Sequence, residues 1–487
     1  MINEYKFGAW LPDQTDFRNP GLEDAENVIP SPNGYIPARE FVAGSTSISG
    51  TIIGASSVFL KDGSVLVLVA TTTDLHVIRG SSVTASSLSL SLATTETVVF
   101  TQFNTEVYAT TKSGTTWVLT DIESDNTFSG ASGSPPSANA MGRVADFLVM
   151  GDLTDIDASD SPYRIRWSRF NNPQGAWDTD LGAQSGAQEL DAKYGPVTAI
   201  TGGSFGLIFQ TSGVTRISFT GSASVFDLDT FEENRGCVAP SSAVQVGERT
   251  FYLAHDGFFR TDGTTPEPIS TARIWDWFIK ECNQTFLPFV AGAVDYQRRC
   301  VVWAFPGGNT RALTRQIWFN WETEQWGSVS QPLDWLVEGA KSGLSLEDVA
   351  AIYPNLDTMP LTLDSPEFQP SGRNLLVLQG GDLGNVLGST LKATFRGGDI
   401  HPRPGERSFV SEVTPLIEAE NINVRLLCRD KMTGPAMESP TSAVGPIGFA
   451  PFNHDARYYG VIIEVPAGEE WSNPYGYQVN AGRSGST

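Results

Sequence analysis

The sequence predicts an all-β chain, in which a β-propeller of about six or seven blades precedes a smaller C-terminal β-sandwich. Three observations lead to this fold class. The 487 residues include 48 glycines and 29 prolines, which suits a protein with many tight turns. The apolar fraction is 40% and the charged fraction only 18%, which excludes a disordered chain. Finally, short β-branched runs joined by polar turns recur along the chain.

The recurring runs form about six units of roughly 40 to 50 residues, the period of a propeller blade. The first begins at Val58 as VFLKDGSVLVLVATTTDLHVIRG, with a hairpin turn at Asp62-Gly63. Several runs are apolar on both faces, as expected for stacked inner strands. After a break near Gln331, NLLVLQGGDLGNVLGSTLKATFRGGD returns to strand-turn-strand, as a further blade or a closing hairpin.

Three regions follow from this pattern: an N-terminal lead-in and docking segment over residues 1–57, the propeller over 58–403, and the sandwich over 404–487. The last region has longer and more widely spaced strands. The best helix candidate is Ser345–Met359, because Ser345 can cap it and acidic residues follow in the first turn.

Charge and cysteine content restrict the function classes. Lys and Arg total 32 against 55 Asp and Glu, a net charge of −23, which disfavours DNA binding but suits a surface that DNA slides past. The four widely spaced cysteines indicate reduced thiols and synthesis in a reducing cytoplasm. We expect neither a signal peptide nor a membrane span, because MINEYKFGAW lacks basic and apolar regions and no run of 18 apolar residues occurs.

Motifs that carry chemistry are missing from the sequence. It contains no GxGxxG, GxxxxGK[ST] or HExxH, so we expect no enzyme activity, cofactor or metal site. The acidic stretch Asp152–Asp160 fails the calcium-loop pattern and is interpreted as a solvated loop. Four tryptophans are expected to pack between blades rather than to stack sugars: Trp303, Trp318, Trp321 and Trp326.

Two stretches are the candidate interfaces. In RIRWSRF, Arg164 and Arg166 point to one face of a strand, and with Arg169 they favour an intersubunit ion pair. The segment Asn19–Phe41, NPGLEDAENVIPSPNGYIPAREF, is rich in turn residues and has no chemistry. Its candidate contact residues are Asn19, Pro20, Asp24, Glu26, Asn33 and Gly34. Two interpretations stay open: a clasp onto a neighbouring subunit, or a lead-in strand that covers its own propeller.

The chain resembles the tail nozzle proteins of short-tailed bacteriophages, which are also known as stabilisation or tail hub proteins. The resemblance runs through most of the chain in one order. It includes NPGLEDAENVIPSPNGYIP, RIRWSRFNNPQGAWDTD, GGSFGLIFQTSGVTRISFTG, FYLAHDGFFRTDGTTPEPISTARIWDWF, AGAVDYQRRCVVWAFP, SLEDVAAIYPNLDTMPLTLDS, PGERSFVSEV and YYGVIIEVPAGEEW. These strings are structural rather than catalytic, and their joint occurrence carries the resemblance.

The resemblance implies a structural virion protein with a propeller body. It implies a homo-oligomeric ring, most simply a hexamer, below the portal and the adaptor ring of the head-to-tail connector. DNA would be retained and then ejected through the central channel without specific binding. Tail fibres or tailspikes and a plug protein would attach to the ring, which would be assembled in the host cytoplasm and reside in the virion tail.

Two alternative functions belong to other classes. A propeller glycosidase or lyase acting on the host surface would need acids and an Arg or His at the central channel. The S-x-D-x-G-x-x-W turns typical of sialidases do not occur in this sequence. A receptor-binding protein would instead bind host cells as an isolated subunit.

Overall fold

The computed structural model describes residues 2–44, 46–222, 224–340 and 373–484. Regular structure in these ranges is almost entirely β-strand, which confirms the all-β prediction. The helices described are α1 (Trp275–Glu281) and three 3-10 turns at Ala192–Tyr194, Pro240–Ser242 and Gln284–Phe289. None of them has the length and apolar character needed to cross a bilayer. The helix expected over Ser345–Met359 lies outside the described residues.

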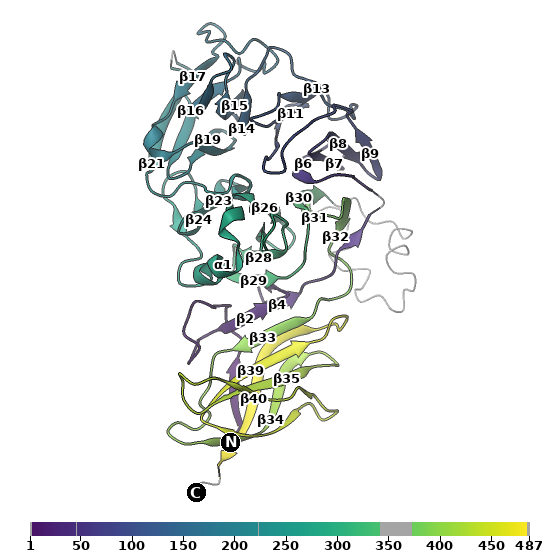
Figure 1. Ribbon diagram of the computed structural model, residues 1–487, viewed down its shortest axis with the longest axis vertical. Coiled ribbons are helices and arrows are strands. Elements are labelled where there is room, and N and C mark those ends of the chain that lie inside the picture. The colour runs from purple at the N-terminus through teal and green to yellow at the C-terminus, as the bar shows by residue number, and fades with distance from the viewer. Residues whose placement is uncertain (1, 45, 223, 341–372, 485–487) are drawn as a thin grey trace.

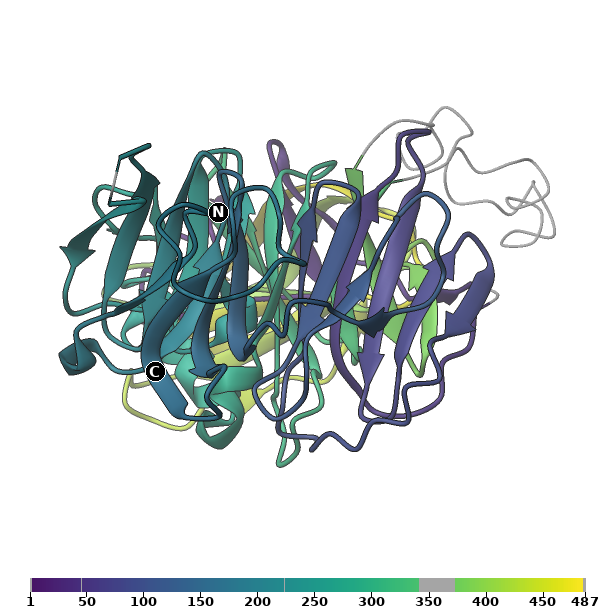
Figure 2. The ribbon, with the colours of Figure 1, turned by 90° about the horizontal axis from the view of Figure 1, so that it is seen from above.

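Seven four-stranded antiparallel units surround a central axis as the blades of a propeller, as Figures 1 and 2 show from two directions. Blade 1 contains β6 (Ile52–Phe59), β7 (Val65–Thr71), β8 (Leu75–Arg79) and β9 (Ser82–Ala85). Blade 2 contains β10 (Val99–Phe103), β11 (Glu106–Thr110), β12 (Trp117–Leu119) and β13 (Ser129–Gly130). Blade 3 contains β14 (Ser137–Val144), β15 (Phe147–Thr154), β16 (Asp160–Trp167) and β17 (Gly186–Glu189).

The remaining blades follow in chain order. Blade 4 contains β18 (Val197–Thr201), β19 (Phe205–Gln210), β20 (Val214–Phe219) and β21 (Phe226–Glu232). Blade 5 contains β22 (Val244–Val246), β23 (Arg249–Ala254), β24 (Gly257–Thr261) and β25 (Glu267–Pro268). Blade 6 contains β26 (Ala291–Asp295), β27 (Cys300–Phe305), β28 (Arg315–Asn320) and β29 (Gln325–Val329). Blade 7 contains β30 (Trp335–Ala340), β31 (Arg373–Gln379), β32 (Asp382–Asn385) and β5 (Val42–Ala43).

The ring of blades is closed by a strand from the N-terminal part of the chain. In blade 7, β5 pairs antiparallel with β32, with Ala43 opposite Gly384. Blade 7 also packs on blade 1 in one apolar cluster that includes Ile52, Val67 and Val377. The stretch NLLVLQGGDLGN is therefore part of a further blade, and the strand that closes it comes from the segment before the first repeat.

Three of the four tryptophans pack between blades, as the sequence predicts, whereas Trp321 is half-buried in the turn after β28 and contacts Tyr296 of the same blade. Trp303 and Trp326 are buried with ring centroids 5.9 Å apart, and both contact Phe258 of blade 5. Trp318 is buried in the cluster on the other face of blade 6, with Leu336 of blade 7. Strand β27 is buried at every position, as expected for a strand that lies between two neighbouring blades.

The sandwich is built from both ends of the chain. Its first sheet has the order β1 (Ile2–Lys6), β40 (Ser472–Arg483), β34 (Ser408–Glu418) and β38 (Ala450–Ala456). Its second sheet contains β33 (Ala393–Gly397), β39 (Tyr458–Val465), β35 (Asn423–Arg429), β36 (Met437–Glu438) and β37 (Ser442–Ala443). In β34 and β35, buried residues alternate with partly exposed ones, which is the pattern of a sheet with one face in the core.

The N-terminal segment joins the two domains. Strand β2 (Leu22–Glu26) pairs antiparallel with β33 of the sandwich and, through Glu26 and Ser328, parallel with β29 of blade 6. One ten-stranded sheet therefore runs from the inner strand of blade 6 into the sandwich. The hairpin of β3 (Val28–Ser31) and β4 (Gly34–Pro37) follows directly (Figure 1).

Strand pairing places the domain boundaries elsewhere than the sequence pattern does. Strands β1, β2 and β33 lie outside 404–487 but belong to the sandwich sheets, and β5 and the start of β6 lie within 1–57 but belong to the propeller. The physical reason is that these pairings are long-range. Ile2 pairs with Asn480, for example, and no local pattern reports such a partner.

Candidate functional site at the propeller and sandwich junction

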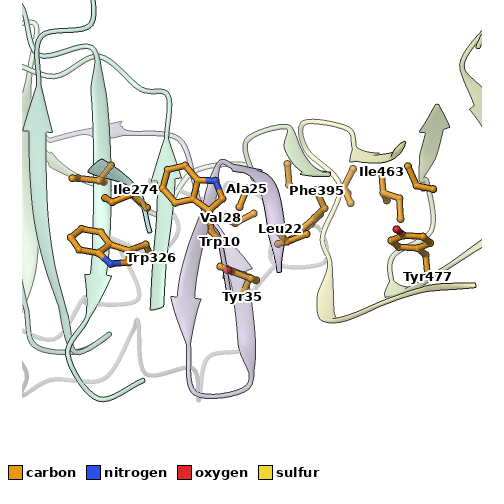
Figure 3. Packing of buried hydrophobic residues seen from close by; sticks show 14 of the residues in the cluster. Trp10, Leu22, Ala25, Val28, Tyr35, Ile274, Trp326, Phe395, Ile463 and Tyr477 are labelled. Atoms are coloured by element: carbon orange, nitrogen blue, oxygen red, sulfur yellow. The ribbon is translucent and has the colours of Figure 1, made fainter. Parts of the chain in front are cut away.

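Residues 8–37 lie between the propeller and the sandwich, and we call this segment with the surfaces that it contacts the junction (Figures 1 and 3). The segment contributes five side chains to the largest apolar cluster: Trp10, Leu22, Ala25, Val28 and Tyr35. The same cluster contains Ile274 and Trp326 of the propeller and Phe395, Ile463 and Tyr477 of the sandwich. The segment therefore joins two hydrophobic cores into one.

Trp10 anchors the segment on the propeller. Its ring is fully buried and meets the ring of Trp277 in helix α1 edge to face, with centroids 4.6 Å apart. The indole Nε1–H donates to the carbonyl oxygen of Glu23 at 3.3 Å, which satisfies the polar end of a buried tryptophan. The apolar surface of one indole thus fixes both the helix and strand β2.

Asp13 caps helix α1 from a distant part of the sequence. The residue at the N-cap position, Ile274, has no side-chain acceptor. Instead, the two carboxylate oxygens of Asp13 accept hydrogen bonds from the backbone N–H groups of Asp276 and Trp277, each at 2.9 Å. A negative charge at a helix N-terminus also interacts favourably with the helix dipole. The cap ties the N-terminal segment to the propeller.

Five charged groups meet where the segment crosses the second sandwich sheet. Arg396 lies 2.9 Å from the carboxylate of Glu23. Arg429 lies 3.1 Å from Asp399 and 3.6 Å from Asp16. Asp399 is 4% exposed, and the shielded atoms Asp399 Oδ1, Glu23 Oε2, Arg396 Nε and Arg429 Nε have no hydrogen-bond partner among the described residues. Three carboxylates thus face two guanidinium groups.

The acids of the junction have raised pKa values. Burial raises the pKa of Glu23 to about 7, against the opposing effect of Arg396, and Asp16 and Asp399 raise it further. Burial likewise raises the pKa of Asp24 to about 6, with an added contribution from Glu26. Burial also raises the pKa of Asp399, although Arg429 opposes the shift. The junction therefore favours a protonated carboxyl near neutral pH.

The candidate residues of the segment contact their own chain. The side chain of Asn19 donates to the carbonyl oxygen of Leu11 at 3.0 Å and accepts from the backbone N–H of Gly21 at 2.9 Å. Glu26 accepts from the Ser330 hydroxyl at 2.7 Å. Asp24 is half-buried beside Arg396, its partner in the strand register. Of the two interpretations left open, these contacts match the strand that covers its own chain.

The remaining candidates lie at turns. Pro20 and Asn33 are exposed, and Asn33 lies at the tip of the β3–β4 hairpin, whose two loop residues precede Gly34. Gly34 has a φ of 113°, a backbone conformation that favours glycine. Behind the tip, the hydroxyl of buried Tyr35 donates to the carbonyl oxygen of Gly8 at 3.3 Å. The hairpin tip is thus exposed while its base is fixed in the junction.

The arginines of RIRWSRF form their ion pairs inside blade 3, which differs from the intersubunit pairing expected from sequence. Arg166 donates to both carboxylate oxygens of Asp155, at 2.8 Å and 3.0 Å. Arg164 contacts Asp155 at 2.8 Å and also Glu189. Arg169 pairs with Asp178 at 3.0 Å. These partners are near in sequence, so the intrachain pairs form without a second subunit.

The acidic stretch Asp152–Asp160 is only partly the solvated loop that the sequence predicts, because Asp157 and Asp160 are exposed but Asp152 and Asp155 are buried. Asp152 is 6% exposed and Asp155 is 4% exposed. Asp152 accepts from Lys112 at 2.5 Å and from the Asn139 amide at 2.6 Å. Although burial alone would raise the pKa of Asp155, hydrogen bonds from Arg166 and Arg164 hold it below its ordinary value. Basic partners, Lys112 in the turn after β11 and Arg164 and Arg166 on β16, let these carboxylates be buried.

The central cavity of the propeller is the other candidate site. It has a volume of about 1030 Å³ and is lined by the inner strands of the blades. The charged residues of its lining are Arg143, Asp146 and Glu338. Arg143 pairs with Asp146 at 3.2 Å, and Glu338 lies 3.3 Å from Arg373. Within the described residues the lining contains no histidine or lysine.

Sequence reasoning missed Asp13, Arg396, Asp399 and Arg429. Their roles depend on partners hundreds of residues away, such as the α1 N-terminus for Asp13. The only local signal is that Arg396 interrupts a buried run between Phe395 and Gly397. The described residues contain no group of three or more His, Cys, Asp or Glu side chains placed to hold a metal ion.

No protein-family model and no curated protein matches the chain. Among solved structures, the selenomethionine-substituted virginiamycin B lyase of Staphylococcus aureus aligns with 71% of this chain and 97% of its own, at 10% identity and a TM-score of 0.38. The Cps50 (Swd1) β-propeller domain of Myceliophteria thermophila aligns with 58% of this chain and 84% of its own, at 9% identity and a TM-score of 0.32. Similarities this distant carry no argument about function.

Proposed function

We propose that the chain is a structural protein of a short-tailed bacteriophage tail, which forms the ring-shaped nozzle below the portal and adaptor through which DNA is retained and ejected. The observation that carries the proposal is the ordered set of structural sequence strings, from NPGLEDAENVIPSPNGYIP to YYGVIIEVPAGEEW, that resembles this family. The proposal places the protein in the virion after assembly in the host cytoplasm.

The rigid joint between the domains supports a mechanical role. The ten-stranded sheet, the shared apolar cluster and the Asp13 cap together resist relative movement of the propeller and the sandwich. A conduit that withstands DNA pressure needs such a joint. The net charge of −23 also suits a wall that DNA passes without specific binding.

The size of the central cavity supports a conduit that lies between subunits rather than inside one. Inner strands of six residues span about 20 Å, so a cavity of about 1030 Å³ is on average only about 8 Å across. The major groove of B-DNA alone is about 12 Å wide. The DNA channel of the proposal is therefore the lumen of the ring, and each subunit interface is heterologous.

The composition of the cavity lining does not separate the nozzle from a propeller glycosidase or lyase. Its charged residues are two carboxylates and one guanidinium, and the carboxylate of Asp146 is paired with Arg143. A general acid and base pair needs two carboxyls in different environments. Asp146 is paired with Arg143, whereas burial raises the pKa of Glu338 against the opposing effect of Arg373, so the activity assay has to decide between the two functions. The adaptor ring, the fibres or tailspikes and the plug protein remain the proposed partners.

Antibody labelling of virions of the encoding phage tests the proposal. A nozzle predicts label at the tail tip in electron micrographs, and label on the head or on none of the virions would contradict it.

Incubation of the purified protein with host polysaccharide separates the alternatives. Release of oligosaccharides would favour the enzyme, and binding of the isolated subunit to host cells would favour a receptor-binding protein.

A further inference from the structure

The charged cluster of the junction has more acids than bases. Asp16 and Glu23 come from the N-terminal segment, Asp399 from the turn after β33, Arg396 from β33 and Arg429 from β35. With every carboxyl ionised the cluster carries a net charge of −1. The shielded oxygen Asp399 Oδ1 accepts no hydrogen bond among the described residues, whereas Glu23 Oε2 lies 2.9 Å from Arg396. Leaving shielded carboxylate oxygens unpartnered is costly.

One proton removes this imbalance. A protonated Glu23 makes the cluster neutral, and its hydroxyl becomes a hydrogen-bond donor in a place that also contains the carboxylates of Asp16 and Asp399. Asp24 adds a second acid directly beside the cluster. The charged groups that face Asp24 are Glu26 on its own strand, Arg396 on β33 and Arg315 on β28. The excess of acids in the charged cluster therefore favours proton uptake when the N-terminal segment is packed between the two domains.

We propose that this cluster is a proton-operated clamp, which holds the N-terminal segment between the propeller and the sandwich more tightly at mildly acidic pH than at alkaline pH, with Glu23 as the principal proton acceptor. The ligand of the site is the proton alone. The proposal does not depend on a role in a phage tail, because it follows from the cluster and its position in the joint.

The direction of the pH dependence follows from the shift of Glu23. Its pKa is about 7 in the seated segment, against 4.5 for an ordinary glutamate. The stabilisation is fully present below the ordinary value and is lost as the pH rises through the seated value. The difference of about 2.5 pKa units corresponds to a change of up to about 300-fold in the opening equilibrium. Between pH 5 and pH 8.5 we expect at least a tenfold change, allowing about a unit of uncertainty in the shift.

Hydrogen–deuterium exchange of the full chain tests the clamp. Amides of residues 8–26 are followed at pH 5, 7 and 8.5, with exchange rates corrected for the intrinsic effect of pH. The clamp predicts at least tenfold greater opening of this segment at pH 8.5 than at pH 5, while blade 3 shows no such change. A segment whose corrected protection is the same at all three pH values would overturn the proposal.

Variants provide the second test. Glu23→Gln removes the titration of Glu23, and Glu23→Gln/Asp24→Asn removes that of both acids. The pH dependence of the segment should shrink at least threefold in the single variant and further in the double variant, which keeps only the contribution of Asp399. The matched control is Glu40→Gln, an exposed carboxyl on the same N-terminal stretch outside the cluster, which should retain the wild-type dependence. A double variant that keeps the full wild-type pH dependence would contradict the proposal, and the wild-type measurement stands even if a variant fails to fold.

Discussion

The guanidinium of Arg166 donates two hydrogen bonds to the carboxylate of Asp155, at 2.8 Å and 3.0 Å, inside blade 3. A further donor hydrogen bond joins Arg166 to the carbonyl oxygen of Trp177 at 2.9 Å. The pair is shielded, since the side chains are 8% and 1% exposed. Its strength and burial make it a structural element of the blade.

Replacing Arg166 with Met should destabilise the propeller by about 3 kcal/mol, because it leaves the buried carboxylate with only Arg164 as a charged partner. Urea unfolding followed by tryptophan fluorescence measures the change. The control is Arg169→Met, which breaks a more exposed pair and should cost less than about 1 kcal/mol. Equal losses in the two variants would show that burial does not set the strength of these pairs.

Asp13→Ala should lower the stability of the junction by about 1 kcal/mol, because the N-terminus of α1 loses the acceptor for two backbone N–H groups. Asp13→Asn keeps one acceptor oxygen and should recover part of the loss. Thermal unfolding followed by circular dichroism measures both. An Asp13→Ala variant that melts with the wild type would refute the capping role.

His76, on β8 of blade 1, makes the stability of the propeller sensitive to acid. It is 8% exposed on β8, and neither ring nitrogen has a hydrogen-bond partner among the described residues. Burial lowers its pKa, so the protonated form is disfavoured in the folded state. The associated stability is present above the ordinary pKa of 6.5 and is lost as the pH falls below it.

His76→Leu should therefore flatten the fall in melting temperature between pH 7 and pH 5, without loss of stability at pH 7. Exposed His255→Leu is the control and should keep the wild-type slope. Differential scanning calorimetry at a series of pH values gives the comparison. If His76→Leu and the wild type lose stability in parallel, the buried imidazole is not the titrating group.

Deletion of residues 1–41 should unfold the sandwich rather than merely free a docking arm. The deletion removes β1 and β2 from the two sandwich sheets and takes Trp10, Leu22 and Val28 out of the shared cluster. Hydrogen exchange of β33, β39 and β40 should approach that of an unfolded chain. Native protection of these strands after the deletion would show that the N-terminal segment is dispensable for folding.

Local pattern was enough to predict the fold class. Hairpins such as β6–β7, which turns at Asp62-Gly63, are predicted by residues that are adjacent in the sequence. The alternation of buried and exposed residues in β34 indicates a sheet with one face in the core. Three of the four tryptophans of blade 6 were correctly expected between blades because rings of that size need two apolar surfaces.

The junction could not be predicted in the same way. Asp13 caps a helix more than 260 residues away in the sequence. Glu23 pairs with Arg396, and nearly all of the propeller strands lie between these two residues in the sequence. Such contacts join residues that are far apart in the sequence, and no spacing in the sequence indicates them. The burial of Asp155 was missed for a different reason, because its partner Arg166 is near in sequence but was expected to pair with a second subunit.

Two-dimensional class averages of the purified protein in the electron microscope test the central claim most directly. A tail nozzle predicts closed rings in end-on views, with six copies of the propeller around an open lumen wide enough for duplex DNA. Isolated particles of single-subunit size at micromolar concentration, in both low and physiological salt, would contradict the account.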